Sequence, residues 1–478
     1  MSLAKHYQNR WLAMGLLCMG ALMIVLDVTI VNVALPSIRA DLGFDETSLA
    51  WVVNAYMLIF GGFLLLGGRL GDLYGHRRVF LIGLALFTLA SFACGLAGSR
   101  AYLLLARGVQ GLGGAIVDAV SLSLIMNLFT AHEDRTKAMG VYGFVCAGGG
   151  GIGALLGGVL TGAFNWHWIF LVNVPVGIAV FALCWWLLPT HAGEAEGRQH
   201  LDVGGAVSVT LALLLAVYAT INGNQAGWGS VQTLGILGAS LVVFGVFLAL
   251  ESRVRKPLVP LAMFRLRNLS VASVVGVLWC AGMFAWFFLS ALYMQRVLNF
   301  SPFQIGMAFL PANLIMAVFS LGLSAKLVMR FGIRGPLAFG LLMAAAGLLL
   351  FARAPLHGTL VADVLPGMLL LGLGAGIGFN PVLMAAMSEV AETESGLASG
   401  LVNTAFMLGG SLGLAALAST AAARTDGLSA AGIGSVSALD GGYQAAFVCG
   451  AAFVALAAVL GGALLRTLNR TAAQSAAH

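Results

Sequence analysis

Apolar residues occur along this chain in long runs that are separated by short, more polar stretches. A helix that crosses a bilayer needs about 20 consecutive, mostly apolar residues. Fourteen runs come close to this length or exceed it, so the pattern predicts an all-α integral membrane protein with 14 transmembrane helices. The approximate ranges of these runs are 11–35, 49–67, 79–98, 101–129, 138–163, 168–188, 203–222, 230–250, 269–294, 303–325, 336–353, 360–388, 397–423 and 443–465.

The basic residues between the runs predict an orientation in the membrane. With the N-terminus placed in the cytoplasm, 18 of the 24 Lys and Arg residues fall on the cytoplasmic side, five fall on the opposite side and Arg107 lies within a run. Cytoplasmic loops carry the excess of basic residues, so we expect both termini in the cytoplasm and the chain in the cell (inner) membrane. The first run is too long for a cleavable signal and is expected to remain as a span.

The composition excludes several classes of protein. Hydrophobic residues make up 60% of the chain, charged residues 9%, and the mean hydropathy is +0.98, so a soluble globular protein is excluded. The net charge of +6 comes from dispersed residues, which argues against nucleic acid as a partner. Phosphate-binding loops and metal-ligand spacings are absent, so we expect no enzyme activity, no cofactor and no metal. Energy for any transport must then come from an ion gradient or from the solute's own concentration gradient.

A weak internal repeat predicts the domain organisation. The polar stretch 68–78 and the stretch 325–334 resemble each other and would occupy equivalent places in two six-helix halves. The expected parts are an N-terminal six-helix bundle (1–190), a cytoplasmic loop with two linker helices (191–250), and a C-terminal six-helix bundle (251–478) with an interfacial loop (252–268).

Asp27 is the one charged residue in the first apolar run. A carboxylate buried in hydrocarbon costs several kcal/mol, so an intramembrane acid is by default interpreted as a proton or ion site. The alternative is an acid that only packs helices together, permanently paired with one base. Asn32, in the same stretch, is assigned to a substrate cavity.

Arg107 is the candidate partner of Asp27. It lies about six residues from the outer end of its run, hence ~9 Å deep, whereas Asp27 lies ~12 Å deep by the same helical rise. The similar depths allow the two side chains to form a coupling pair for protons.

Asp118 follows Arg107 by eleven residues, which places both on one helix face with Gly111 and Ala115 between them. A base, a smooth groove and a second acid on one face would suit a cationic ligand. The alternative is a structural acid hydrogen-bonded to a nearby serine, Ser121 or Ser123.

Three further groups of residues are candidates for function. The ninth run offers Trp279, Trp286 and Tyr293 to a flat lipophilic ligand, although lipid-facing packing explains most aromatic residues there. The stretch after the second run is a candidate gating loop, and the fifth run carries glycines that suit close helix packing. The loop residues are Gly68, Asp72, Gly75, Arg77 and Arg78, and the glycines are Gly153, Gly157 and Gly158.

Seven segments together resemble the fourteen-span drug:proton antiporters of the major facilitator superfamily, over nearly the whole chain. They are Leu26–Pro36, Gly68–Arg78, Arg107–Gly114, the glycine run through Gly158, Trp166–Pro175, Leu201–Gly204 and the segments from Ser301-Pro302 to Leu310-Pro311. The chain departs from the family pattern at four places. Ala154 stands where a proline is usual, His167 and His76 replace basic residues, and Phe406-Met407 stands where relatives often carry Arg-Gln.

This resemblance implies a proton-coupled secondary transporter that exports amphipathic drugs or toxic small molecules by alternating access. It also implies that Asp27 and Arg107 serve proton coupling and that Asp72 belongs to the gating loop. Partners would be the small-molecule substrate, protons and the lipid bilayer, with a monomer as the expected state and an adaptor protein as an option. The alternatives are a facilitator of one specific metabolite and a non-transporting membrane receptor or scaffold.

Overall fold

The computed structural model describes residues 3–129, 132–188, 202–254, 257, 259–390 and 395–466. Within these ranges the regular elements are helices and no strand occurs. The helices are α1 (Leu3–Leu42), α2 (Glu46–Leu49), α3 (Trp51–Tyr74), α4 (His76–Gly95), α5 (Arg100–Leu128), α6 (His132–Ala163), α7 (Trp168–Leu171), α8 (Asn173–Leu187), α9 (Val203–Ala226), α10 (Val231–Arg253), α11 (Arg267–Arg296), α12 (Pro302–Val318), α13 (Ser324–Phe331), α14 (Arg334–Phe351), α15 (Leu365–Met387), α16 (Ser395–Ala430) and α17 (Ser435–Leu464). A 3₁₀ turn, η1 (Leu261–Arg265), and two π-helical turns, η2 (Phe319–Leu323) and η3 (Leu360–Val364), lie between them.

Short polar side chains begin several of these helices. Ser99 accepts a hydrogen bond from the backbone N–H of Tyr102, and Asp202 caps α9 through the N–H of Gly205. Ser301 and Gln304 form a reciprocal capping box at the start of α12. Each cap satisfies a backbone donor that the first turn of a helix leaves unpaired.

Twelve described helices are long and apolar enough to cross a membrane, which makes the chain a multi-pass membrane protein. They account for twelve of the fourteen expected spans. The other two expected spans fall on α6 and α12, whose described apolar stretches, Gly149–Ala163 and Pro302–Val318, are shorter.

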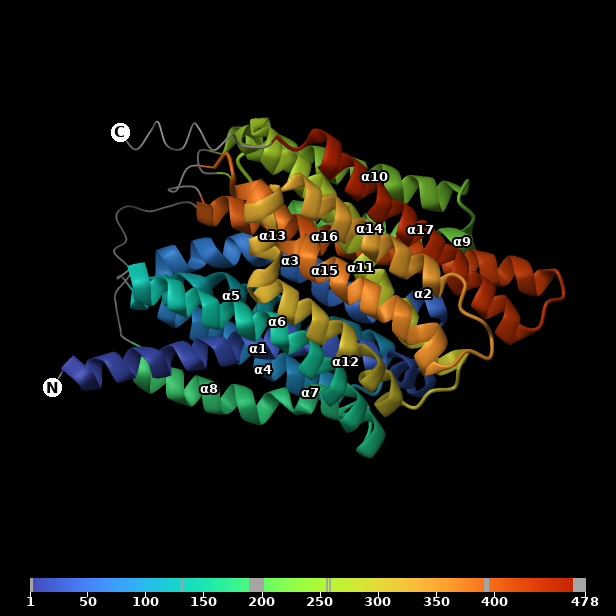
Figure 1. The fold of residues 1–478 in the computed structure, drawn as a ribbon, viewed down its shortest axis with the longest axis horizontal. Helices are drawn as coiled ribbons and strands as arrows, with labels where there is room; N and C mark the ends of the chain where they lie inside the picture. The colour runs from blue at the N-terminus through green and yellow to red at the C-terminus, as the bar shows by residue number, and fades with distance from the viewer. Residues whose placement is uncertain are drawn as a thin grey trace.

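The long helices run roughly side by side along the longest axis of the molecule (Figure 1). The first residue of α1 and the last residue of α17 lie at the same end, on the left of Figure 1, which we call the terminal end. The opposite end is called the distal end. α1, α3, α4, α5, α6 and α8 pack together, as do α11, α12, α14, α15, α16 and α17. These two groups contact each other through α6 on α12, α3 on α16 and α1 on α11.

From the sequence, the stretch Thr425–Gly442, rich in Gly, Ser and Ala, is predicted to be a flexible outward loop, but the structure shows mostly helix there. α16 continues to Ala430 and α17 begins at Ser435, so the two helices form a hairpin that projects at the distal end (Figure 1). Glycines permit this close pairing: a Cβ on Gly442 would lie 2.1 Å from the Thr425 hydroxyl. Alanine-rich sequence has a high helix propensity, which the prediction of a loop underestimated.

α9 and α10, the helices expected to form the linker, pack against each other, and α9 contacts both α3 and α16. Near the terminal end, Thr210 of α9 lies against Gly62 of α3, where an added Cβ would meet its hydroxyl at 1.9 Å. Near the distal end, Asn224 of α9 donates to the carbonyl of Ser419 in α16 at 2.6 Å. α9 therefore lies over the seam between α3 and α16.

Candidate functional site

Asp27 of α1 and Arg107 of α5 form an ion pair inside the helix bundle. Nη1 of Arg107 lies 2.5 Å from Oδ2 of Asp27, and the two side chains are 1% and 0% exposed. The other oxygen, Oδ1, accepts from Nε2 of Gln110 at 2.7 Å and from Nδ2 of Asn173 at 3.3 Å. The amide of Gln110 also donates to Ser91 of α4 at 2.8 Å. The buried carboxylate is therefore fully hydrogen-bonded by residues from α5 and α8.

Arg107 is held by more than its acidic partner. Its Nε donates to the carbonyl of Val52 in α3 at 3.0 Å, and its Nη1 donates to Oε1 of Gln110 at 2.8 Å. Its guanidinium carbon lies 4.5 Å from the ring centre of Tyr56 and 5.6 Å from that of Phe170. A guanidinium surrounded by carbonyl oxygens and aromatic faces retains favourable contacts when its acid is neutralised.

This arrangement permits a specific proton chemistry. With Asp27 ionised, the pair is neutral overall and fixes α1 against α5. With Asp27 protonated, the ion pair is lost while the other contacts of Arg107 remain. The expected proximity of the two residues is thus present in the structure.

Gln110 and Asn173 were not singled out from the sequence as site residues. Gln110 lies three residues after Arg107, so both side chains project from the same helix face. Asn173 is an amide that begins an apolar helix and is 4% exposed. The spacing of Gln110 from Arg107, and the presence of the polar Asn173 in an apolar run, are the sequence features that could have identified these two residues.

Asp118 lies apart from this ion pair and is only partly buried. Its Oδ1 accepts a hydrogen bond of 3.2 Å from the hydroxyl of Tyr142 in α6. The hydroxyl of Ser121 instead donates to the carbonyl of Val117 at 2.6 Å. The hydrogen-bond partner of Asp118 that the structure shows is therefore on another helix, not the serine of its own helix.

The small residues between Arg107 and Asp118 are packed against α3. A Cβ added to Gly111 would lie 2.4 Å from the Tyr56 carbonyl oxygen, and Ala115 is 0% exposed. The face predicted as a smooth groove is covered by a neighbouring helix in this conformation. Asn32 is also buried, and its amide donates to the carbonyl of Val28 at 2.9 Å.

The three aromatic candidates on α11 are all buried. Trp279 packs edge-on to Phe406 with ring centres 6.1 Å apart, and Trp286 packs on Phe309 at 5.8 Å. The hydroxyl of Tyr293 donates to a backbone carbonyl of the α14–α15 connection at 2.9 Å. Among the described residues, the indole nitrogens of Trp279 and Trp286 have no hydrogen-bond partner.

The candidate gating loop forms the turn from α3 to α4. Gly75 has a φ of 89°, a backbone conformation that favours glycine, and it ends α3. Arg77 donates to the carbonyl of Trp185 in α8 and lies over its ring at 5.6 Å, while Arg78 is exposed. Gly68 has open space around it, and the side chain of Asp72 lies outside the described part of the structure.

The glycine run places α6 between α1 and α12. A Cβ on Gly153 would meet the Thr29 hydroxyl of α1 at 1.9 Å, and one on Gly157 would meet the Ile30 carbonyl at 2.8 Å. A Cβ on Gly158 would meet the Pro302 carbonyl of α12 at 2.6 Å. These three glycines therefore permit close contact with both neighbours.

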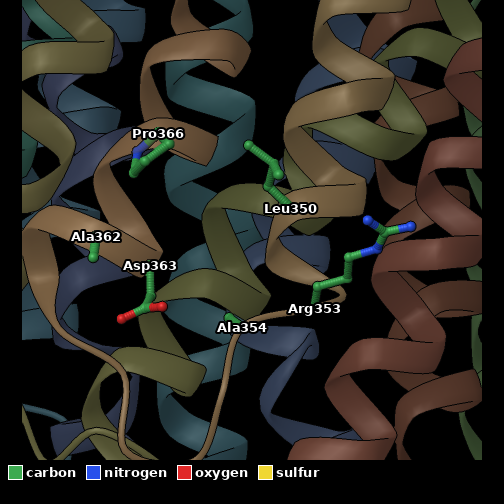
Figure 2. Close-up of a pocket in the computed structure, with 6 residues that line it drawn as sticks. All are labelled: Leu350, Arg353, Ala354, Ala362, Asp363 and Pro366. Carbon is green, nitrogen blue, oxygen red and sulfur yellow. The ribbon is translucent and has the colours of Figure 1, made fainter.

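A small cavity of about 150 Å³ lies elsewhere, at the distal end of α14 and α15 (Figure 2). Figure 2 shows Arg353 and Asp363 among the residues that line it, and none of the predicted site residues belongs to this lining. Asp363 lies in η3 and accepts a hydrogen bond of 2.6 Å from the backbone N–H of Thr359, the residue that caps this turn. The cavity is therefore formed by other helices than α1 and α5, which carry the ion pair.

Comparisons with known proteins identify the family of this fold. Residues 17–414 match the family model of the Major Facilitator Superfamily. The chain is 37% identical to the puromycin resistance protein of Streptomyces alboniger over 97% of its length and 93% of that protein's. It is 37% identical to the cephamycin export protein of Amycolatopsis lactamdurans, over 94% of this chain and 91% of that protein. It is 36% identical to a multidrug resistance protein of Mycobacterium tuberculosis strain CDC 1551 / Oshkosh, over 85% of this chain and 74% of that protein.

Solved structures of transporters share the fold. A POT family transporter covers 94% of this chain and 96% of its own with a TM-score of 0.69 at 15% identity. The structure of a nucleoside transporter matches 95% of this chain and 100% of its own chain, with a TM-score of 0.66 and 12% sequence identity. Family match, relatives and fold agree: the chain belongs to the Major Facilitator Superfamily and is a membrane transporter, not an enzyme.

Proposed function

We propose that this transporter exports amphipathic small molecules, of the kind that act as drugs or toxins, in exchange for protons. The observation that carries the proposal is the buried Asp27–Arg107 ion pair with its amide donors. Relatives whose names describe antibiotic resistance or export support the class of substrate. An acid retained in a membrane helix is costly unless it is used or neutralised.

Protonation of Asp27 is the proposed coupling step. The ionised carboxylate binds Arg107 and so keeps α1 against α5. Protonation neutralises the carboxylate and removes this attraction, which allows the two helices to move. Arg107 keeps its contacts with Val52 and Tyr56, which lowers the free energy of the state without an ion pair. The proton enters from outside and leaves inside as the solute is exported.

Asp118 and the aromatic residues of α11 are proposed to face the substrate when the seam between the helix groups opens. Trp279 and Trp286 are seven residues apart, hence on one face of α11, and their indole N–H groups have no partner in the described structure. An unpaired buried donor costs about 1–3 kcal/mol, which a polar atom of a ligand would recover. Thr404 and Ser411 of α16 have the same spacing and the same unpaired hydroxyls.

The proposed topology has fourteen spans, with both termini in the cytoplasm and the chain in the cell (inner) membrane. It adds α6 and α12 to the twelve longer helices, since each packs between other spans. The two transport halves would be residues 1–190 and 251–478, with 191–250 as the linker, and the loop of Asp72, Arg77 and Arg78 would gate their motion. We propose a monomer as the working unit.

A facilitator of one metabolite is the second candidate. Ala154 favours it, because α6 runs without a proline where the antiporter pattern usually has one. Such a facilitator would move its solute only downhill and would not displace protons. The same experiment therefore separates the two functions.

The test is substrate-driven proton movement in proteoliposomes that contain a pH-sensitive dye. Asp27→Asn keeps the volume of the side chain but cannot titrate, so it should abolish proton movement and uphill export while binding persists. Asp27→Glu should restore part of the coupling. Asp41→Asn is the matched control, because Asp41 lies on the same helix but is exposed and bonded to Trp166. Wild-type coupling in Asp27→Asn would refute the assignment and move the proton site to Asp118.

A further inference from the structure

A second cavity lies between the linker helix α9 and the α16–α17 pair, near the distal end. Its volume is about 530 Å³, and it is lined by α9, α16 and α17, which are all long and apolar enough to span a membrane, and by Trp228 of the turn that follows α9. It is separate from the ion pair and from the small cavity of Figure 2. Its lining residues are Thr220, Asn224, Trp228, Ala416, Ser419, Thr420, Ala423, Arg424 and Ala445.

Most polar groups of this lining are already hydrogen-bonded within the protein. The indole of Trp228 donates to Asn224 at 2.8 Å, and Asn224 donates to the hydroxyl of Ser419 at 2.9 Å. The hydroxyls of Thr220 and Thr420 each donate to the carbonyl four residues earlier, at 2.8 Å. The wall of the cavity therefore presents mainly methyl groups and an indole ring to an occupant.

Arg424 is the one charged residue of the lining, and it is exposed at the distal rim. No ion-pair partner of Arg424 occurs among the described residues. Asp426 follows it by two residues and therefore projects from nearly the opposite side of the helix. The cavity thus combines an apolar wall with a cationic rim, and no lining residue is acidic.

We infer that this groove binds a phospholipid with an anionic headgroup that carries no amine, such as phosphatidylglycerol, in the leaflet at the distal end. The acyl chain lies along Ala416 and Ala445, and the headgroup phosphate pairs with Arg424. From Ala416 to Arg424 the helix rises ~12 Å, which is close to the ~15 Å hydrocarbon depth of one leaflet. Trp228, 51% exposed, follows the end of α9 and lines the groove together with Arg424, and tryptophan is enriched where membrane proteins contact headgroups.

Charge distinguishes this lipid from other occupants. A lipophilic cation would be repelled by Arg424 and would find no acid in the lining. A zwitterionic headgroup would satisfy Arg424 with its phosphate but would leave its ammonium without a protein partner. The lipid joins α9 to α16 and α17 beside the hydrogen bonds of Asn224, so its binding does not depend on the proposed export function.

The test is lipid binding to the purified full-length protein in detergent, measured by native mass spectrometry. Phosphatidylglycerol and phosphatidylcholine with identical acyl chains are compared for the wild type and for Arg424→Gln. The matched control is Arg353→Gln, an exposed arginine at the same end of the bundle that lines the other cavity (Figure 2). A double variant, Ala416→Leu with Ala445→Leu, fills the groove without changing charge.

The wild type should prefer phosphatidylglycerol about fivefold, the effect of one arginine near a lipid surface. Arg424→Gln should lose this preference, Arg353→Gln should keep it, and the filled variant should bind both lipids less. Brominated phosphatidylglycerol should quench the tryptophan fluorescence of the wild type more than that of Trp228→Phe. This second measurement tests whether the lipid binds beside Trp228 even if the filled variant does not fold. Equal loss of preference in both arginine variants, an unaffected filled variant, or displacement of the lipid by tetraphenylphosphonium would overturn the inference.

Discussion

At the scale of single residues, the two amides beside Asp27 differ in what they connect. Gln110 donates to Asp27 at 2.7 Å and also bonds Arg107 and Ser91, whereas Asn173 makes one longer contact of 3.3 Å. Gln110→Leu should therefore impair export more than Asn173→Leu does. A hydrogen bond to a charged group contributes about 1.5–3 kcal/mol, so the loss for Gln110→Leu should reach about tenfold or more. Uphill export by the two variants, at matched protein amounts in vesicles, is the measurement, and the reverse ranking would contradict it.

Asp118 allows a prediction about the charge of the substrate. If its carboxylate recognises a positive charge, Asp118→Asn should reduce export of cationic compounds about tenfold and leave neutral compounds nearly unchanged. Tyr142→Phe removes the hydrogen bond to Asp118 but keeps the acid, so it serves as the control for a purely structural role. Export of one cationic and one neutral dye by both variants gives the answer. An equal loss for both dyes would show that Asp118 is structural.

The residues of the site were predictable from the sequence to different degrees. Asp27 and Arg107 could be paired because helical rise alone places them at similar depth. The amides of Gln110 and Asn173 could not be assigned, since their contacts depend on how α5 and α8 turn toward α1. Gly111 and Ala115 are predicted to form a smooth groove on their helix, but which neighbouring helix packs into such a face is decided by tertiary structure.

At the scale of helices, α6 provides a test of close packing. Gly158→Ala should disturb the contact of α6 with α12, because its Cβ would lie 2.6 Å from the Pro302 carbonyl, a backbone atom that cannot rotate away. Gly162 lies one turn later on α6 with open space around it, so Gly162→Ala should be neutral or slightly stabilising. We expect Gly158→Ala to lower the unfolding temperature in detergent by several degrees and to reduce transport, and Gly162→Ala to do neither. Similar behaviour of the two variants would show that the contact is unimportant.

The helices themselves were largely predictable, because runs of apolar residues of bilayer length have few alternatives to a helix. The exceptions have physical causes. Polar and small residues at 425–442 hid a helical hairpin that projects past the other helices, because hydropathy measures contact with lipid rather than helix formation. α12 continues through the π-helical turn η2 into α13, so the helix along this expected span extends beyond Val318.

At the scale of the whole molecule, the two groups of helices meet mainly where α6 contacts α12, α3 contacts α16, and α1 contacts α11. The ion pair lies inside one group, between α1 and α5, and not across a seam. Protonation of Asp27 would therefore affect the contacts between the two groups indirectly, by changing how α1 packs against α11 and α6. The linker helix α9 follows the α3–α16 seam and contacts both sides of it.

Covalent closure of that seam gives the last prediction. A Cβ on Gly61 of α3 would lie 3.0 Å from the Cβ of Met407 in α16, so a small outward adjustment of the two helices reaches the ~3.5–4.5 Å spacing that a disulfide requires. In a chain whose six cysteines have been replaced, Gly61→Cys with Met407→Cys should be oxidised readily. Transport should then stop, because alternating access requires the two groups of helices to separate, and it should return on reduction.

The control for this cross-link is a pair within one group of helices. Gly462 of α17 lies near Ala338 of α14, with a Cβ-to-Cβ distance of 3.6 Å. A disulfide between cysteines at these two positions joins helices that should move together, so transport should persist after oxidation. Each variant is measured reduced and oxidised in the same vesicles, which removes differences in folding and expression. If the oxidised α3–α16 pair transports as well as its reduced form, α3 and α16 do not separate there and the seam that opens must be sought between α6 and α12.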